Sequence, residues 1–103
     1  MKVKVIFLLH KIFELEKDNY LVNNVNENST ITEFIRKLSN ELRSEIIWKL
    51  ITESNSKGLL VLVNGTIIND LNTTFKTLKN SFKGSEEFEI TIVPLLEGGS
   101  GSR

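Results

Sequence analysis

The sequence contains no cysteine and a single histidine, His10. Without cysteine the chain can form no disulfide, no thiolate nucleophile and no cysteine-ligated metal site. One histidine alone supplies neither a metal-binding cluster nor a nucleophile–base pair. We interpret His10 as a solvated or edge residue and expect a protein that is not an enzyme, without catalytic residues, metal or cofactor. The lack of cysteine also favours a reducing compartment, the cytoplasm.

Net charge and long apolar runs are lacking as well. Thirteen basic residues balance thirteen acidic ones, so no long-range positive field would attract nucleic acid. The longest apolar stretches, residues 5–9 and 59–63, are far shorter than the roughly 18 residues that a membrane span requires. The N-terminal segment has no small-residue cleavage site and is better explained as a strand. Neither nucleic acid nor a membrane is therefore an expected partner.

A length of 103 residues, 40% of them hydrophobic, is typical of one globular domain. Alternation predicts a first strand over residues 2–9, with an apolar face formed by Val3, Val5, Phe7 and Leu9. Residues 11–15 fit a short helical turn. Residues 19–25 are predicted to form a second strand in which Tyr20 and Val22 share a face.

A helix is predicted to begin at Thr30, because Glu33 follows three residues later and the pair forms a capping box. Apolar residues then recur at steps of three and four, at Ile31, Phe34, Ile35, Leu38 and Leu42. Residues 44–51 either extend this helix or form a second short one. They include Trp48, which is interpreted as a core residue, with an exposed partner patch as the alternative.

The second half of the chain predicts three further strands. Residues 59–63 form an apolar run that ends at Asn64-Gly65, a pair typical of a two-residue hairpin turn, and residues 66–68 begin the returning strand. A polar connection rich in Asn and Thr follows. Alternation at Phe88, Ile90 and Ile92 predicts a last strand, which Pro94 ends. One main helix on a mixed sheet of four to five strands is an α+β roll.

The chain ends with "GGSGSR", in which Gly98 and Gly99 are adjacent. A diglycine alone is a weak signal, and this segment is equally typical of a flexible linker or an engineered tail. Here the diglycine follows the last predicted strand, so it would form a flexible end directly after a rigid domain. Glycine has no Cβ, so such a tail can enter a narrow channel. The residues from Pro94 to Gly99 can span at most ~20 Å.

In this order and spacing, four segments resemble the β-grasp family of ubiquitin-like modifiers and sulfur carriers, which includes MoaD, ThiS, the archaeal small modifiers and the ubiquitin-related modifier. They are "VKVIFLLHKIFEL", "STITEFIRKLSNEL", "VLVNG" and "EITIVPLLEGG". The resemblance covers residues 1–99 and implies a β-grasp domain over residues 1–94, followed by a flexible tail over residues 95–103. The segment "NSFKGSEEFEI" is longer than the compact turn that many relatives have before the last strand.

The resemblance also implies a function. An ATP-dependent adenylating enzyme of the ubiquitin-activating type would activate the carboxylate of Gly99, with Gly98 threading its channel. Lysines of target proteins or a sulfur donor would then receive the acyl group. Many relatives end at the second glycine, so a processing metalloprotease would first cleave between Gly99 and Ser100. Leu95 and Leu96 are the expected partner contacts, unless they pack back on their own sheet.

Two alternatives to a modifier remain open from the sequence: a dedicated MoaD-type sulfur carrier for molybdopterin synthesis, and a β-grasp module that docks on a partner without being conjugated. A modifier forms covalent adducts with lysines, a dedicated carrier forms a thiocarboxylate, and a docking module forms neither. Whether residues 100–103 are a natural or an engineered extension is also left open.

Overall fold

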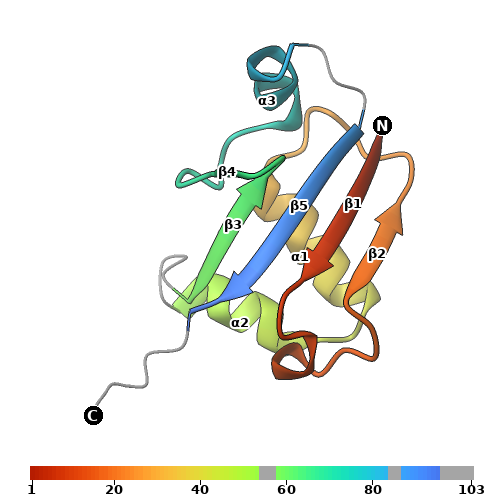
Figure 1. Ribbon diagram of the computed structural model, residues 1–103, viewed down its shortest axis with the longest axis vertical. Helices are drawn as coiled ribbons and strands as arrows, with labels where there is room; N and C mark the ends of the chain where they lie inside the picture. The colour runs from red at the N-terminus through yellow and green to blue at the C-terminus, as the bar shows by residue number, and fades with distance from the viewer. Residues whose placement is uncertain (54–57, 84–86, 96–103) are drawn as a thin grey trace.

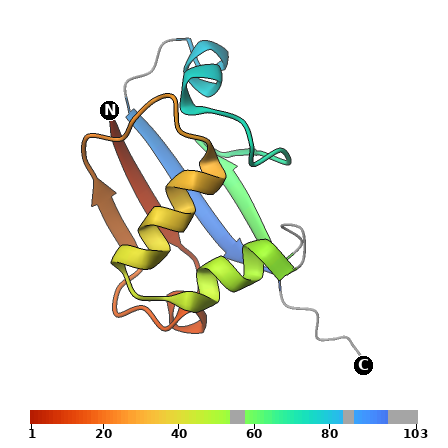
Figure 2. The ribbon, with the colours of Figure 1, turned by 180° about the vertical axis from the view of Figure 1, so that it is seen from behind.

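The computed structural model describes residues 1–53, 58–83 and 87–95. In chain order, the elements of these residues are β1 (Lys2–Phe7), the 3₁₀ helix η1 (His10–Phe13), β2 (Asn19–Val22), α1 (Ile31–Glu41), α2 (Glu45–Glu53), β3 (Leu59–Val63), β4 (Thr66–Ile67), α3 (Phe75–Ser81) and β5 (Glu87–Pro94). The strands form one mixed sheet in the order β2-β1-β5-β3-β4. Helices α1 and α2 cover one face of this sheet (Figures 1 and 2). The α+β roll predicted from the sequence is therefore confirmed.

The last strand lies in the middle of the sheet. β5 pairs in parallel with β1, with Val5 opposite Ile90, and antiparallel with β3, with Val61 opposite Ile92. β2 and the two-residue strand β4 form the two edges. The strand that leads to the C-terminal tail is thus hydrogen-bonded to β1 on one side and to β3 on the other.

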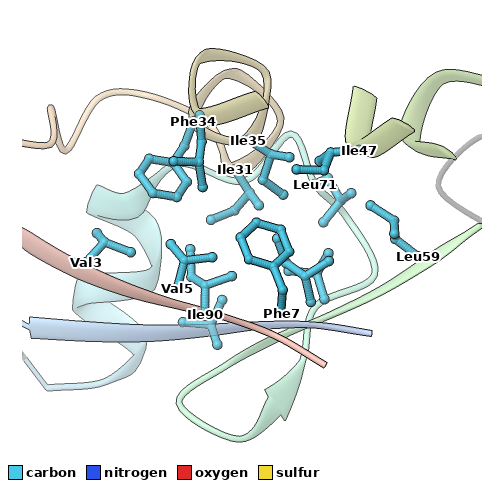
Figure 3. Close-up of a cluster of buried hydrophobic side chains, with 14 of the residues drawn as sticks. Val3, Val5, Phe7, Ile31, Phe34, Ile35, Ile47, Leu59, Leu71 and Ile90 are labelled. Carbon is cyan, nitrogen blue, oxygen red and sulfur yellow. The ribbon is translucent and has the colours of Figure 1, made fainter. Parts of the chain in front are cut away.

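The hydrophobic core lies between the sheet and the two covering helices (Figure 3). Alternate residues of the central strands point into it, as the two-residue period of a strand requires. From α1 it receives Ile31, Phe34 and Ile35, and from α2 it receives Ile47. The fully buried side chains include Val3, Val5, Phe7, Ile90 and Ile92.

Helix α1 begins as the sequence predicts. The backbone N–H of Glu33 donates to Oγ1 of Thr30 at 3.1 Å, and the N–H of Thr30 donates to Oε1 of Glu33 at 2.9 Å. This is the reciprocal pair of bonds that defines a capping box. The segment after it forms a separate helix, α2, because Arg43 takes a left-handed conformation at φ 55° between the two.

Helix α3 differs from the prediction, which was a polar connection over these residues. Thr74 caps it by accepting a bond from the N–H of Thr77 at 3.2 Å, and Phe75 and Leu78 are buried. The ring of Phe75 meets that of Phe34 edge to face, with centroids 5.4 Å apart. The segment therefore belongs to the core rather than to an irregular loop.

The ends of three elements differ from the prediction. β1 stops at Phe7, because Leu9 takes a left-handed conformation at φ 55° and opens the turn into η1. Leu9 is 59% exposed, so its predicted place on the core face is wrong. The helical turn covers His10–Phe13 rather than residues 11–15, and β2 ends at Val22 rather than at residue 25.

Candidate protein-binding face and C-terminal exit

One face of the sheet carries no helix among the described residues, and Figure 1 looks onto it. Strand register aligns outward-facing side chains across this face: Ile6 lies opposite Thr91, Thr91 opposite Leu62, and Leu62 opposite Ile67. In the next row, Val93 lies opposite Leu60. We define the apolar patch as Ile6, Leu60, Leu62, Ile67 and Val93.

The apolar patch is partly open to solvent. Ile67 is 50% exposed, and the other four side chains are half-buried. Next to it, Leu8 and Leu95 are 45% and 42% exposed. Contiguous exposed apolar surface of this kind, on a sheet face with a polar margin, is typical of protein interaction sites.

The polar margin lies at the other end of the same face. Lys2 is opposite Glu87 and Lys4 is opposite Glu89 across β1 and β5. These positions alternate with core residues, so their side chains point to the same side as the apolar patch. The face therefore has an apolar half, toward the end of β5, and a charged half, toward its start.

The chain leaves the sheet beside the apolar half. Pro94 is buried opposite Leu59, and the N–H of Leu95 donates to the carbonyl of Gly58 at 3.0 Å. Gly58 has little room for a side chain, because a Cβ there would lie 3.0 Å from the carbonyl oxygen of Leu50. The predicted end of regular structure at Pro94 is confirmed, and it fixes the point from which the tail departs.

One of the tail residues predicted to form the site, Leu95, is among the described residues. Leu96, Gly98, Gly99 and Ser100 lie outside the described residues. Leu95 is described, and its exposed side chain is compatible with the predicted partner contact, which stays a prediction. His10 is half-buried at the start of η1.

Trp48, which the sequence analysis interprets as a core residue, belongs to α2 on the helical side of the sheet. Trp48 is half-buried, packs against the core and stacks with Arg36, whose guanidinium carbon is 5.3 Å from the ring centroid.

Within the described ranges, no three His, Asp or Glu side chains are grouped closely enough to hold a metal ion. No helix in that part of the chain has the length and apolar character to cross a membrane.

The apolar patch was not among the sites predicted from the sequence. A signal for it was present, because β3 reads LLVLV and is apolar at outward as well as inward positions. A strand that is apolar on both faces needs cover on both. Only one face has that cover in the described part of the chain.

No protein-family model matches this sequence, and no curated protein sequence matches it significantly. Solved structures do match. The crystal structure of SAMP1 from Haloferax volcanii superposes with a TM-score of 0.65 at 13% identity, over 96% of this chain and 100% of that one. The solution structure of the small archaeal modifier protein SAMP1 from Methanosarcina acetivorans gives 0.60 at 18% identity, over 95% and 96%.

A third match is the complex of subunits 1 and 2 of the molybdopterin-converting factor from Helicobacter pylori, with a TM-score of 0.50 at 19% identity over 96% of this chain and 100% of the matched chain. At these identities the likeness concerns the fold. It agrees with the topology described above, in which a central last strand is parallel to the first and one helical layer packs on a mixed sheet. The protein has the β-grasp fold found in small archaeal modifiers and in the molybdopterin-converting factor complex.

Proposed function

We propose that this protein is a ubiquitin-like modifier that is activated at the carboxylate of Gly99. The observation that carries the proposal is the exit of the chain. In a β-grasp domain, the central strand β5 ends at a buried Pro94 and leads, beside an exposed apolar patch, toward a diglycine. A partner that binds the patch is then close to Leu95, from which four residues of the chain lead to Gly99.

The proposed chemistry starts with removal of residues 100–103. A processing metalloprotease hydrolyses the bond between Gly99 and Ser100, and water supplies the new carboxylate oxygen. That carboxylate attacks the α-phosphorus of ATP in an adenylating enzyme of the ubiquitin-activating type, which releases pyrophosphate and leaves an acyl-adenylate. A lysine amine of a target protein then displaces AMP and forms an isopeptide bond. In this scheme the chain is a substrate and needs no catalytic residue of its own.

Diglycine suits this sequence of steps for a physical reason. The carbonyl carbon must be reached in a narrow, water-excluded site, and a side chain on either of the last two residues would occupy that space. Gly98 and Gly99 have no Cβ and accept most backbone conformations. Leu95 and Leu96 would contact the partner at the mouth of the channel, each contributing up to about 1.5–3 kcal/mol if fully buried.

A second candidate function is sulfur transfer, and the similarity to the molybdopterin-converting factor complex favours it. The same acyl-adenylate would react with a persulfide sulfur instead of an amine. AMP leaves, and reductive cleavage of the resulting disulfide by a thiol gives a thiocarboxylate at Gly99. The two functions share the activation step and differ in the nucleophile.

The test is a reconstituted activation assay. A chain that ends at Gly99 is mixed with ATP, magnesium and an adenylating enzyme encoded in the same genome, and its mass is measured. We expect a gain of one adenylyl group, which is lost when the adduct is treated with hydroxylamine. The full chain, which ends at Arg103, is the matched control and should stay unmodified.

Addition of cell extract separates the two functions. A modifier gives a ladder of larger proteins in which Gly99 is joined to lysines, whereas a dedicated carrier gives a mass change of one oxygen replaced by sulfur. A trimmed chain that gains no adenylyl group with any such enzyme of the genome would refute both functions and favour a docking module that is never conjugated.

A further inference from the structure

The turn between β3 and β4 holds a chemically reactive pair of residues. Asn64 is the only asparagine in the sequence that precedes a glycine. The backbone nitrogen that follows an asparagine can attack the carboxamide carbon of its side chain, which closes a succinimide ring. A side chain on the attacking residue hinders this approach, and Gly65 has none. Of all the asparagines in the chain, Asn64 is therefore the one at which the local sequence favours ring closure most.

The surroundings of this pair are open. Asn64 and Gly65 are both exposed, and a Cβ added at Gly65 would meet no heavy atom within 4 Å beyond its two chain neighbours. The carboxamide nitrogen of Asn64, which would leave as ammonia, has no hydrogen-bond partner among the described residues. Water can therefore reach the carboxamide without displacing any of these residues.

The folded turn nevertheless holds the reacting groups apart. In the sheet, β3 lies between β5 and β4 (Figure 1). The side-chain oxygen of Asn64 accepts a hydrogen bond from the N–H of Glu89 on β5 at 2.9 Å, so the carboxamide is directed to the β5 side. The chain returns through Gly65 toward β4, on the other side of β3. The carboxamide carbon can close on the Gly65 nitrogen only after the bond to Glu89 is broken.

This barrier is local, because the hairpin is short. β4 consists of Thr66 and Ile67, which are both exposed, and it pairs with β3 at the edge of the sheet. Segments with few buried contacts open at a lower free energy than the core does. Detachment of β4 frees the backbone angles of Asn64 and Gly65, so the carboxamide can leave Glu89 while the rest of the sheet stays folded.

We propose that Asn64 is a site of spontaneous deamidation and that the hairpin controls its rate. When β4 detaches, the nitrogen of Gly65 forms a bond to Cγ of Asn64 and passes its proton to the leaving amide, which departs as ammonia. Water then adds to a carbonyl carbon of the succinimide and opens the ring to aspartate or isoaspartate. The net reaction consumes one water and releases one ammonia. It needs neither the tail nor an activating enzyme, so the inference is independent of the proposed function.

Isoaspartate at this position would change the candidate binding face. Its main chain runs through the former side-chain carbon and is longer by a methylene group. A two-residue hairpin of this type depends on left-handed α-residues in the turn, so the pairs Leu62–Ile67 and Val63–Thr66 would lose their register. Ile67 would then leave its place beside Leu62 in the apolar patch. The reaction thus removes a residue from the patch and adds a carboxylate at its margin.

Peptide mapping by mass spectrometry provides the test, on the full chain kept folded at mildly alkaline pH. The product is detected as the replacement of an amide by a carboxyl group, and isoaspartate as a substrate of an isoaspartyl O-methyltransferase. We expect Asn64 to be the first asparagine converted. A capped peptide of residues 61–68, which cannot form the bond to Glu89, should react at least about tenfold faster, a barrier difference of about 1.4 kcal/mol.

Two variants test the control by the hairpin. Thr66→Pro removes the N–H with which a two-residue hairpin closes on Val63. Deamidation at Asn64 should then approach the rate of the peptide, with the far-UV circular dichroism spectrum almost unchanged. Asn69→Ala, at an exposed position after β4, should leave the rate as in the unaltered chain. If Thr66→Pro unfolds, the ratio of the rates in the peptide and the unaltered chain decides.

Several outcomes would overturn the inference. They are earlier conversion of another asparagine, equal rates in the chain and the peptide, and an unchanged rate in a folded Thr66→Pro variant. A rate ratio as large as the equilibrium constant of global unfolding, measured in urea, would also overturn it, because Asn64 would then react only from the unfolded chain.

Discussion

Asn64 and Glu89 are joined by two hydrogen bonds across the sheet. The backbone N–H of Asn64 donates to the carbonyl of Glu89 at 2.8 Å, and the N–H of Glu89 donates to the side-chain oxygen of Asn64 at 2.9 Å. Asn64 has φ 50° and Gly65 has φ 84°, the left-handed pair of a two-residue hairpin. The turn between β3 and β4 is thereby fixed to the central strand.

The first prediction follows from this pair. Asn64→Ala removes the bond to Glu89 and places alanine in a left-handed conformation that asparagine tolerates better. We expect the free energy of unfolding in urea to fall by about 1–2 kcal/mol. Asn69→Ala, at an exposed position in the segment after β4, should change it by less than about 0.5 kcal/mol. Equal effects of both changes would contradict this account of the turn.

The second prediction concerns α3. Phe75 is fully buried and contacts the rings of Phe34 and Phe88, with centroids 5.4 and 5.8 Å away. Phe75→Ala should lower the free energy of unfolding by about 3–5 kcal/mol, as expected for a truncated core phenylalanine. Lys76→Ala on the exposed side of the helix is the control and should have almost no effect. A loss below about 1 kcal/mol would mean that α3 is dispensable for the core.

The third prediction concerns the apolar patch and its extension at Leu8. Ile67 and Leu8 are about half exposed, so Ile67→Lys with Leu8→Lys should leave the far-UV circular dichroism spectrum and the urea midpoint almost unchanged. If a partner covers both side chains, each contributes roughly 0.7–1.5 kcal/mol, half the value for full burial. Adenylation of a chain ending at Gly99 should then slow at least about tenfold at subsaturating concentration.

The matched control for the patch is Lys76→Glu, an exposed charge change on α3. It should leave adenylation unchanged. An unchanged rate in the double lysine variant would show that the activating enzyme does not contact this face.

The fourth prediction concerns the tail. In a chain ending at Gly99, Gly98→Phe adds a ring where the proposed channel accepts only backbone, so adenylation should fall at least about a hundredfold, roughly 2.7 kcal/mol. In the full chain, Ser102→Phe alters a residue that processing removes, and conjugation in cell extract should persist. Activation of the Gly98→Phe chain at the normal rate would exclude the proposed role of the diglycine.

Local chemistry explains which parts of the fold were predictable. The capping box of Thr30 and Glu33 and the hairpin pair Asn64-Gly65 depend on neighbouring residues alone, and both are confirmed. The end of β1 was mispredicted, because the alternating pattern continues to Leu9 while the backbone turns at that residue. Sequence alternation cannot report a left-handed residue that is not glycine or asparagine.

Helix α3 was missed because polar residues outnumber apolar ones over its short span. Its signal is the spacing of Leu71, Phe75, Leu78 and Phe82, which repeats at steps of four and three. Tertiary contacts with α1 stabilise the segment, including the bond from the N–H of Ile31 to the carbonyl of Thr73 at 3.0 Å. The apolar patch depends on register between strands distant in sequence, which local patterns do not specify.

The position of β5 has a mechanical consequence. Because β1 and β5 run in parallel through six aligned positions, the start of the first strand and the end of the last lie at opposite ends of the ladder. Force applied between the two termini would load these hydrogen bonds together, in shear, rather than peel them one at a time. A molecular motor that pulled the two termini apart would thus have to break the whole β1–β5 ladder before the domain could open.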